Sequence, residues 1–236
     1  MRGRTRRCFW LAGVAFAAAM SLSPGANAQI TFGQIDDFQL NPVGDSVLGW
    51  TRGVNAPQYP FVVATGGPQG ADGFLEVPTT GTTGSGARIN FFNQSQWTGN
   101  YVAAGVTQIT AEIADFGATP LYMRIAFQDA FGTEYGSTNY DFVPADGQWH
   151  PVSFDLTPAG LTLLQGGETA EQALTTVGIL RVLSNAEMPS YRGDVIPNVM
   201  GMDEVAAVPE PAPPTFVGAV AAVLLCRRRR VARNFK

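Results

Sequence analysis

Two segments in the middle of the chain alternate polar and apolar side chains. Residues 108–113 do so in strict alternation, and residues 121–128 place four apolar side chains on one face, at Leu121, Met123, Ile125 and Phe127. A period of two is the pattern of a β-strand with one buried face. Both segments are therefore predicted to be half-buried strands of an antiparallel sheet.

Short apolar runs separated by clusters of Gly, Pro, Asn and Asp recur through the rest of the middle of the chain. They predict further strands at residues 35–40, 61–64, 73–77, 87–92, 148–156, 177–184 and 200–205. Helical character is limited to residues 169–175 and 101–104. Many short strands, 27 glycines and almost no helix favour an all-β fold, a sandwich of two antiparallel sheets, over residues 29–205.

The first 28 residues have the pattern of a secretory signal peptide. Four arginines precede an apolar run over residues 8–20, and the small-residue triplet Ala26-Asn27-Ala28 follows. We expect cleavage after Ala28. An uncleaved membrane anchor is the alternative, but the apolar run is shorter than the ~20 residues that a span needs.

The other end of the chain combines a linker with a short apolar helix. Residues 206–214 hold four prolines in nine positions, which predicts an extended linker. Residues 215–226 are apolar and uncharged, and they begin a segment, 215–236, that is predicted to form a short transmembrane helix with a basic tail. The block Arg227, Arg228, Arg229 and Arg230 is expected to stay in the cytoplasm.

The charge of the chain is divided unevenly between its ends and its middle. Residues 29–207 contain five arginines, no lysine and 18 acidic residues, a net charge of -13. Such an acidic body has no electrostatic footprint for nucleic acid or anionic lipid. Cations, neutral polymers and other proteins are the partners that this composition favours.

The middle of the chain lacks the usual elements of a hydrolytic centre. Both cysteines lie outside residues 29–207, so that segment has neither a thiol nor an internal disulfide. Its one histidine, His150, stands at a predicted strand entrance and is read as a packed or surface residue rather than a catalytic base. A glycosidase needs only two carboxylates, but the pattern singles out no pair among 18. We therefore expect no catalytic residues and no enzymatic activity.

The carboxyl-terminal segment resembles a known sorting signal. Pro209, Glu210 and Pro211, followed by a short apolar helix and an arginine cluster, are similar to the PEP-CTERM signal of Gram-negative and related bacteria. This resemblance implies recognition by an exosortase, transient insertion in the inner membrane and cleavage near the motif. Release to the cell surface or to an extracellular polysaccharide matrix would follow. An ordinary carboxyl-terminal anchor is the alternative.

The middle of the chain resembles galactose-binding-like jelly rolls, the fold of many carbohydrate-binding modules. The resemblance rests on short motifs spread over residues 36–205: Asp36-Asp37-Phe38, Gly49-Trp50, Gly70-Ala71-Asp72-Gly73, Gly147-Gln148-Trp149 and Gly201-Met202-Asp203-Glu204-Val205. The segment 95–101 also looks like one that recurs in exported PEP-CTERM proteins. The resemblance implies a jelly-roll sandwich whose first and last strands lie side by side.

That adjacency makes a calcium site one possible reading of four carboxylates. The resemblance implies that Asp36 or Asp37 approaches Asp203 or Glu204, and calcium takes six to eight oxygen ligands. Gln39 stands where such modules commonly have an acidic residue. The alternative is that these acids are solvated at strand ends. A structural calcium is thus the one cofactor to consider.

Sugar recognition usually combines an aromatic platform with a few directed hydrogen bonds. Trp97 is the preferred platform because it lies in a polar segment flanked by glycine. The other aromatic candidates are Trp50, Tyr101, Tyr135 and Tyr140. The polar candidates are Arg88, Asn90, Asn93 and Asp129. Each aromatic has the alternative role of closing the core.

Two classes of function remain open. The first is an exported, sorted module that binds extracellular polysaccharide without catalysis. The second is a structural or adhesive surface protein with no defined sugar site. A glycoside hydrolase is a third, weaker alternative.

Overall fold

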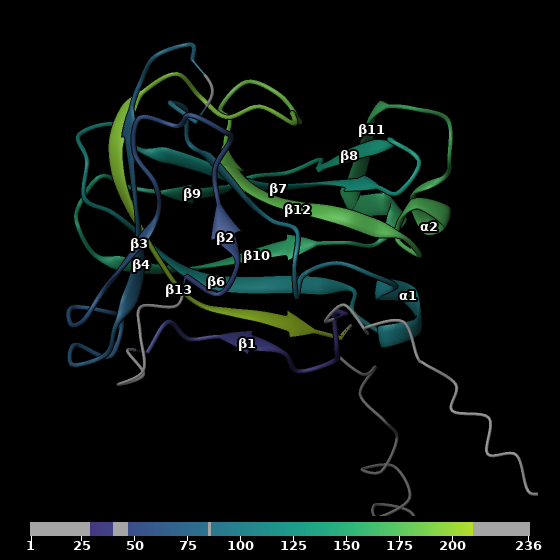
Figure 1. Ribbon diagram of the computed structural model, residues 1–236, viewed down its shortest axis with the longest axis horizontal. Helices are drawn as coiled ribbons and strands as arrows, with labels where there is room; N and C mark the ends of the chain where they lie inside the picture. Colours follow the sequence, from purple (N-terminus) through teal and green to yellow (C-terminus); the bar gives the residue numbers. More distant parts are fainter. Residues whose placement is uncertain (1–28, 40–46, 85, 210–236) are drawn as a thin grey trace, which may run out of the picture.

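The computed structural model describes residues 29–39, 47–84 and 86–209. The predicted signal peptide and all of the predicted sorting segment beyond Pro209 lie outside the described residues. The described chain forms two antiparallel sheets packed face to face, with short helices at one end (Figure 1). This confirms the predicted all-β fold of two antiparallel sheets, and the strand order is consistent with a jelly-roll sandwich.

The six-stranded sheet has the order β10–β6–β13–β4–β3, and β1 also pairs with β13. Every pairing in it is antiparallel. Its last strand in the sequence lies in its middle, between β6 and β4. The bounds are β1 Ile35–Asp36, β3 Phe61–Val63, β4 Phe74–Thr80, β6 Gln108–Asp115, β10 Trp149–Asp155 and β13 Pro197–Val208.

The seven-stranded sheet has the order β11–β8–β7–β12–β5–β2, and β9 pairs with the far end of β7. The bounds are β2 Trp50–Thr51, β5 Asn90–Asn93, β7 Leu121–Asp129, β8 Glu134–Ser137, β9 Asp141–Val143, β11 Leu161–Gln165 and β12 Val177–Ser184. Two one-turn helices, α1 Tyr101–Ala104 and α2 Ala170–Ala173, and the 3-10 turn Pro158–Gly160 complete the described elements.

The core lies between the two sheets and follows the alternation seen in the sequence. The apolar residues of β7, predicted to share one face, are all fully buried: Leu121, Met123, Ile125 and Phe127. Ile109 and Ile113 of β6 are buried in the same cluster from the opposite sheet. Because side chains alternate across a strand, the residues between them point away from this core. Arg124 and Ala126 of β7 are nevertheless buried on the other face of the sheet.

Most predicted elements are present with shifted bounds, and four strands were not predicted. The predicted segments 177–184 and 101–104 coincide with β12 and α1. Strands β2, β8, β9 and β11 are five residues long or shorter, so their period is hard to detect in the sequence. None of the helices in the described part of the chain is long and apolar enough to cross a membrane.

Candidate binding site

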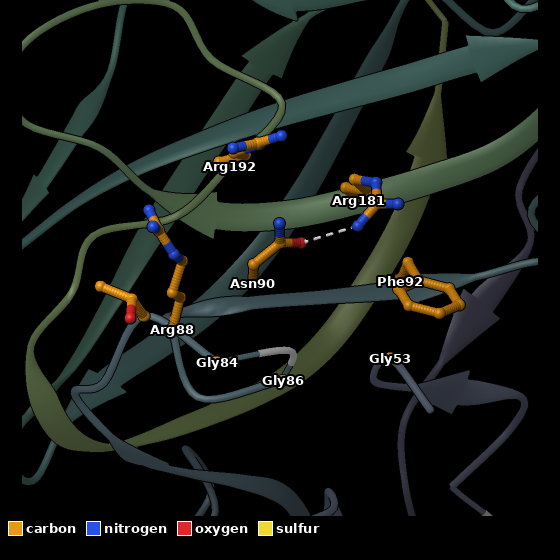
Figure 2. A pocket seen from close by; sticks show the side chains of 9 residues that line it. Gly53, Gly84, Gly86, Arg88, Asn90, Phe92, Arg181 and Arg192 are labelled. Carbon is orange, nitrogen blue, oxygen red and sulfur yellow. Dashed lines mark hydrogen bonds between the residues drawn. The ribbon is translucent and has the colours of Figure 1, made fainter. Parts of the chain in front are cut away.

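A pocket of about 460 Å³ lies beside strands β5 and β12 on the outward face of the seven-stranded sheet. Among the described residues that line it, three are arginines and none is acidic. Figure 2 shows Asn90 between Arg88 on one side and Arg181 on the other. The full lining is Gly53, Thr83, Gly84, Gly86, Arg88, Asn90, Phe92, Arg181 and Arg192.

Strand alternation explains why these side chains meet on one face. Phe91 of β5 is fully buried, so its neighbours Asn90 and Phe92 face away from the core. On β12, Leu180 and Val182 are buried and Arg181 between them faces outward. Arg181 is the register partner of Phe92, which places both side chains over the same point of the sheet.

Arg181 is held in place by rings and by an amide. Its guanidinium carbon lies 4.0 Å from the ring centroid of Tyr191 and 4.9 Å from that of Phe92. Such cation–π contacts stabilise a cation by about 0.5–2 kcal/mol. Arg181 Nη1 also donates to Asn90 Oδ1 at 3.3 Å, an interaction drawn in Figure 2. The side chain therefore presents its charge in a restricted orientation.

The segment 185–196, between β12 and β13, closes one side of the pocket. Arg88 Nη1 donates to the carbonyl of Gly193 at 3.2 Å, and Asn90 Nδ2 donates to the carbonyl of Tyr191 at 3.0 Å. A Cβ added at Gly193 would lie 1.7 Å from the carbonyl oxygen of Ile89. Only a residue without a side chain lets this segment approach the backbone ahead of β5 so closely.

A buried arginine supports the opposite wall. Arg52 is 3% exposed. Its Nη1 donates to the carbonyls of Pro78 at 2.6 Å and Gly86 at 2.9 Å, and its Nη2 donates to that of Arg88 at 2.9 Å. Burial lowers the pKa of Arg52 to about 10, which leaves it charged at neutral pH. These three bonds fix the backbone that carries two of the pocket residues.

The structure corrects the prediction that Trp97 is an exposed sugar platform. Trp97 is fully buried, and its indole Nε1 donates to Asp36 Oδ2 at 2.6 Å. Trp50 is buried beside it and donates to the same oxygen at 2.8 Å. Tyr101 is also buried and donates its hydroxyl to the carbonyl of Trp97 at 2.9 Å. Trp97 can be buried although its segment is polar, because Asp36 supplies the hydrogen-bond acceptor that a buried indole needs.

The remaining sequence candidates divide between the pocket, the core and the surface. Arg88 and Asn90 line the pocket, as described. Tyr135 is buried and stacks on Phe127 at 5.7 Å between ring centroids. Asn93 and Asp129 are buried and accept backbone N–H bonds within turns. Tyr140 is 45% exposed, with its ring edge-to-face against Tyr122.

Three of the four carboxylates predicted to bind calcium lie near one another: Asp37 and Glu204 line the same pocket, and the charges of both act on Asp203. Strand β1 lies beside β13, as the resemblance implied, with Asp36 opposite Val205. Asp36, however, is turned inward to the two indoles. Glu204 Oε1 accepts a hydrogen bond from Gln69 Nε2 at 2.6 Å. Within the described residues, no group of three or more His, Cys, Asp or Glu side chains is arranged to hold a metal ion. The predicted ligand set therefore does not fit calcium in this arrangement.

Asp203 nevertheless has an unusual environment. It is fully buried, its Oδ1 accepts the backbone N–H of Glu204 at 2.8 Å, and its Oδ2 has no partner among the described residues. Burial, together with the nearby charges of Asp72, Glu204 and Asp37, raises the pKa of Asp203 to about 7. This carboxyl gains a proton near neutral pH, a condition that the sequence did not indicate.

His150 lies at the surface in a local ion pair. Its Nε2 is 3.1 Å from Oδ1 of Asp146, four residues earlier. This contact is the only ion pair among the described residues. The hydrogen bonds to Gln148 and His150 lower the pKa of Asp146. No hydroxyl or thiol nucleophile is among the hydrogen-bond partners that the structure gives His150.

Sequence comparison shows no matching protein family and no matching curated protein. Similar solved structures exist at low identity. The chain is similar to a segment of an exo-β-agarase, with 10% identity and a TM-score of 0.53 over 79% of this chain and 26% of the agarase chain. It is also similar to the family 11 carbohydrate-binding module of Clostridium thermocellum in complex with a β-1,3-1,4-mixed-linked tetrasaccharide. That match has 14% identity and a TM-score of 0.49 over 76% of this chain and 97% of the module. The chain spans about a quarter of the agarase, and at such identities the likeness concerns the fold.

Proposed function

We propose that the sandwich is a non-catalytic module that binds extracellular polysaccharide. The observation that carries the proposal is the pocket on the outward face of the seven-stranded sheet. It joins charged and amide donors to a half-buried aromatic ring, and these side chains are held by contacts within the protein. Binding sites for sugars need this combination of directed hydrogen bonds and an apolar ring surface.

The chain is further proposed to act outside the cell. Its residues 1–28 would direct export, and the segment from Pro209 onward would be recognised by an exosortase after transient insertion in the inner membrane. The mature protein would then reach the cell surface or the extracellular matrix. Fractionation of the producing cells tests this part, since a protein that stays in the cytoplasm with residues 1–28 intact would contradict it.

Binding to a panel of polysaccharides tests the function itself. The full chain is measured by affinity electrophoresis against neutral and acidic polymers, including the extracellular polymer of the producing organism. Saturable binding that soluble oligosaccharides of the same polymer compete away is expected. If no polymer in the panel binds, the protein is instead a structural or adhesive surface component. Release of reducing sugar from any polymer would contradict the absence of catalysis.

A further inference from the structure

The pocket concentrates positive charge on a body that is otherwise acidic. Residues 29–207 hold 18 acidic residues and only five arginines. Three of these arginines line the same pocket, and no acidic residue is among the described residues that line it. A neutral sugar is recognised through hydrogen bonds and an aromatic surface and has no need of several cations. The lining therefore indicates a ligand with negative charge.

The protein does not neutralise these guanidinium groups itself. The only ion pair in the described part of the chain is the one at His150, so none of the pocket arginines has a carboxylate partner there. Each guanidinium carries five N–H donors. Arg88 and Arg181 each use one in the bonds to Gly193 and Asn90, and Arg181 Nε is buried without a partner among the described residues. Oxygen acceptors on a ligand would satisfy donors that the fold leaves open.

The planar shape of the guanidinium groups and the negative charge of the rest of the domain indicate which kind of anion the pocket can bind. A planar guanidinium binds a carboxylate through two parallel hydrogen bonds. A polymer with a negative charge on every sugar unit would be repelled along its length by a protein body of net charge -13. A sugar with one carboxylate places its charge in the pocket and its ring against Phe92. Resting on the proposed function, we infer that the pocket binds a uronic acid unit of a polysaccharide.

The test compares acidic oligosaccharides with their uncharged forms. The full chain is titrated by calorimetry with neutral oligosaccharides that carry a single galacturonate, glucuronate, mannuronate or guluronate unit, with the methyl ester of each, and with a sulfated galactan oligosaccharide. One of the free acids is expected to bind at least about tenfold more tightly than its ester, because the ester loses charge-assisted hydrogen bonds. High salt should weaken that binding.

Variants locate the binding in the pocket. Arg88→Gln and Arg192→Gln should each weaken binding of the free acid by about tenfold. Arg181→Lys, which keeps the charge and loses the planar donors, should weaken it as well. The matched control is Ala103→Glu, at an exposed position of α1. It changes the net charge by the same amount as Arg192→Gln and should leave the affinity unchanged. Circular dichroism and melting temperature confirm that each variant is folded.

The possible results separate this inference from the proposed function. Equal binding of acid and ester, binding of the sulfated oligosaccharide alone, or unchanged affinity in all three arginine variants overturns the uronate site. If a neutral polysaccharide still binds in those cases, the proposed function survives and only the inference fails. If no polysaccharide of any kind binds, the proposed function fails too.

Discussion

Replacing Trp97 by phenylalanine should destabilise the fold and leave ligand binding intact. The Trp97 indole donates to Asp36 Oδ2 at 2.6 Å in a fully buried environment. Phenylalanine removes that donor. A hydrogen bond to a charged acceptor contributes roughly 1.5–3 kcal/mol net, and the volume lost from the core adds about 1 kcal/mol or more. We therefore expect a loss of about 2.5–4 kcal/mol in the free energy of unfolding.

The expected loss of stability depends on Asp36, the shared acceptor of both indoles. Burial raises the pKa of Asp36 above its ordinary value, and the hydrogen bonds from Trp97, Trp50 and Gln96 offset only part of that rise. With Trp97 removed, the carboxylate keeps Trp50 Nε1 at 2.8 Å and Gln96 Nε2 at 3.2 Å. The double variant with Trp50→Phe leaves only the glutamine as a side-chain donor. Because the two indoles share one oxygen, the two substitutions should be non-additive.

The assay is urea unfolding followed by far-ultraviolet circular dichroism, with the melting temperature as a second measure. For a domain of this size the loss corresponds to a drop of roughly 10 °C. Trp149→Phe is the control, because Trp149 is only half-buried and donates to the neutral carbonyl of Gly66 at 3.0 Å. It should cost less than about 1.5 kcal/mol. Two results would contradict the stabilising role of the hydrogen bond from Trp97 to Asp36. One is a cost of less than about 0.5 kcal/mol for Trp97→Phe. The other is loss of polysaccharide binding without a change in stability.

Three further predictions follow from the site. Between pH 4 and 7, in chelator-containing buffer, the free energy of unfolding should fall as pH rises. The folded pKa of Asp203 is about 7, against 3.8 ordinarily, so its protonation stabilises the fold fully below pH 3.8. That stabilisation, up to about 4 kcal/mol, is lost as the pH rises through 7. Asp203→Asn should flatten that part of the profile, and an unchanged slope would contradict the assignment. Arg52→Met should lower the free energy of unfolding by about 2–4 kcal/mol in denaturant titrations, because the carbonyls of Pro78, Gly86 and Arg88 lose their donor; Arg52→Lys should recover part of it, and an equal loss in both would argue against the bonds. Gly193→Ala should cost about 1–3 kcal/mol in the same titrations, since its Cβ would overlap the Ile89 carbonyl, whereas Gly167→Ala, which meets nothing within 4 Å, should have little effect.

The fold could be predicted from the sequence better than the binding site could. Alternation is a local property, so β7 and β12 were visible in the sequence, as was the face of β7 that is buried. Pairing across the sheet is not local. The sequence contains no sign that Arg181 lies opposite Phe92, and the pocket depends on that register. Arg88 and Asn90 were singled out as polar candidates, but Arg181 and Arg192 were not.

Trp97 shows why a polar neighbourhood misleads. Its segment contains Ser95, Gln96 and Thr98, which suggested solvent exposure. The acceptor that makes burial of its indole favourable is Asp36, 61 residues earlier. The one signal in the sequence was the pair of acids, Asp36 and Asp37, at a strand with apolar neighbours, since one of the two would have to face the core. That signal was attributed to calcium instead.

The central position of β13 determines when the sandwich can form. Strand β13 is the last strand of the described chain, and it joins β6 to β4 while also holding β1. Without it the six-stranded sheet separates into two unconnected strand pairs, β10–β6 and β4–β3, and β1 has no partner strand. Each pair would then present unpaired backbone and an uncovered apolar face. A chain still being synthesised or translocated therefore cannot complete its core until residue 208 has emerged, and during that interval it depends on protection from aggregation.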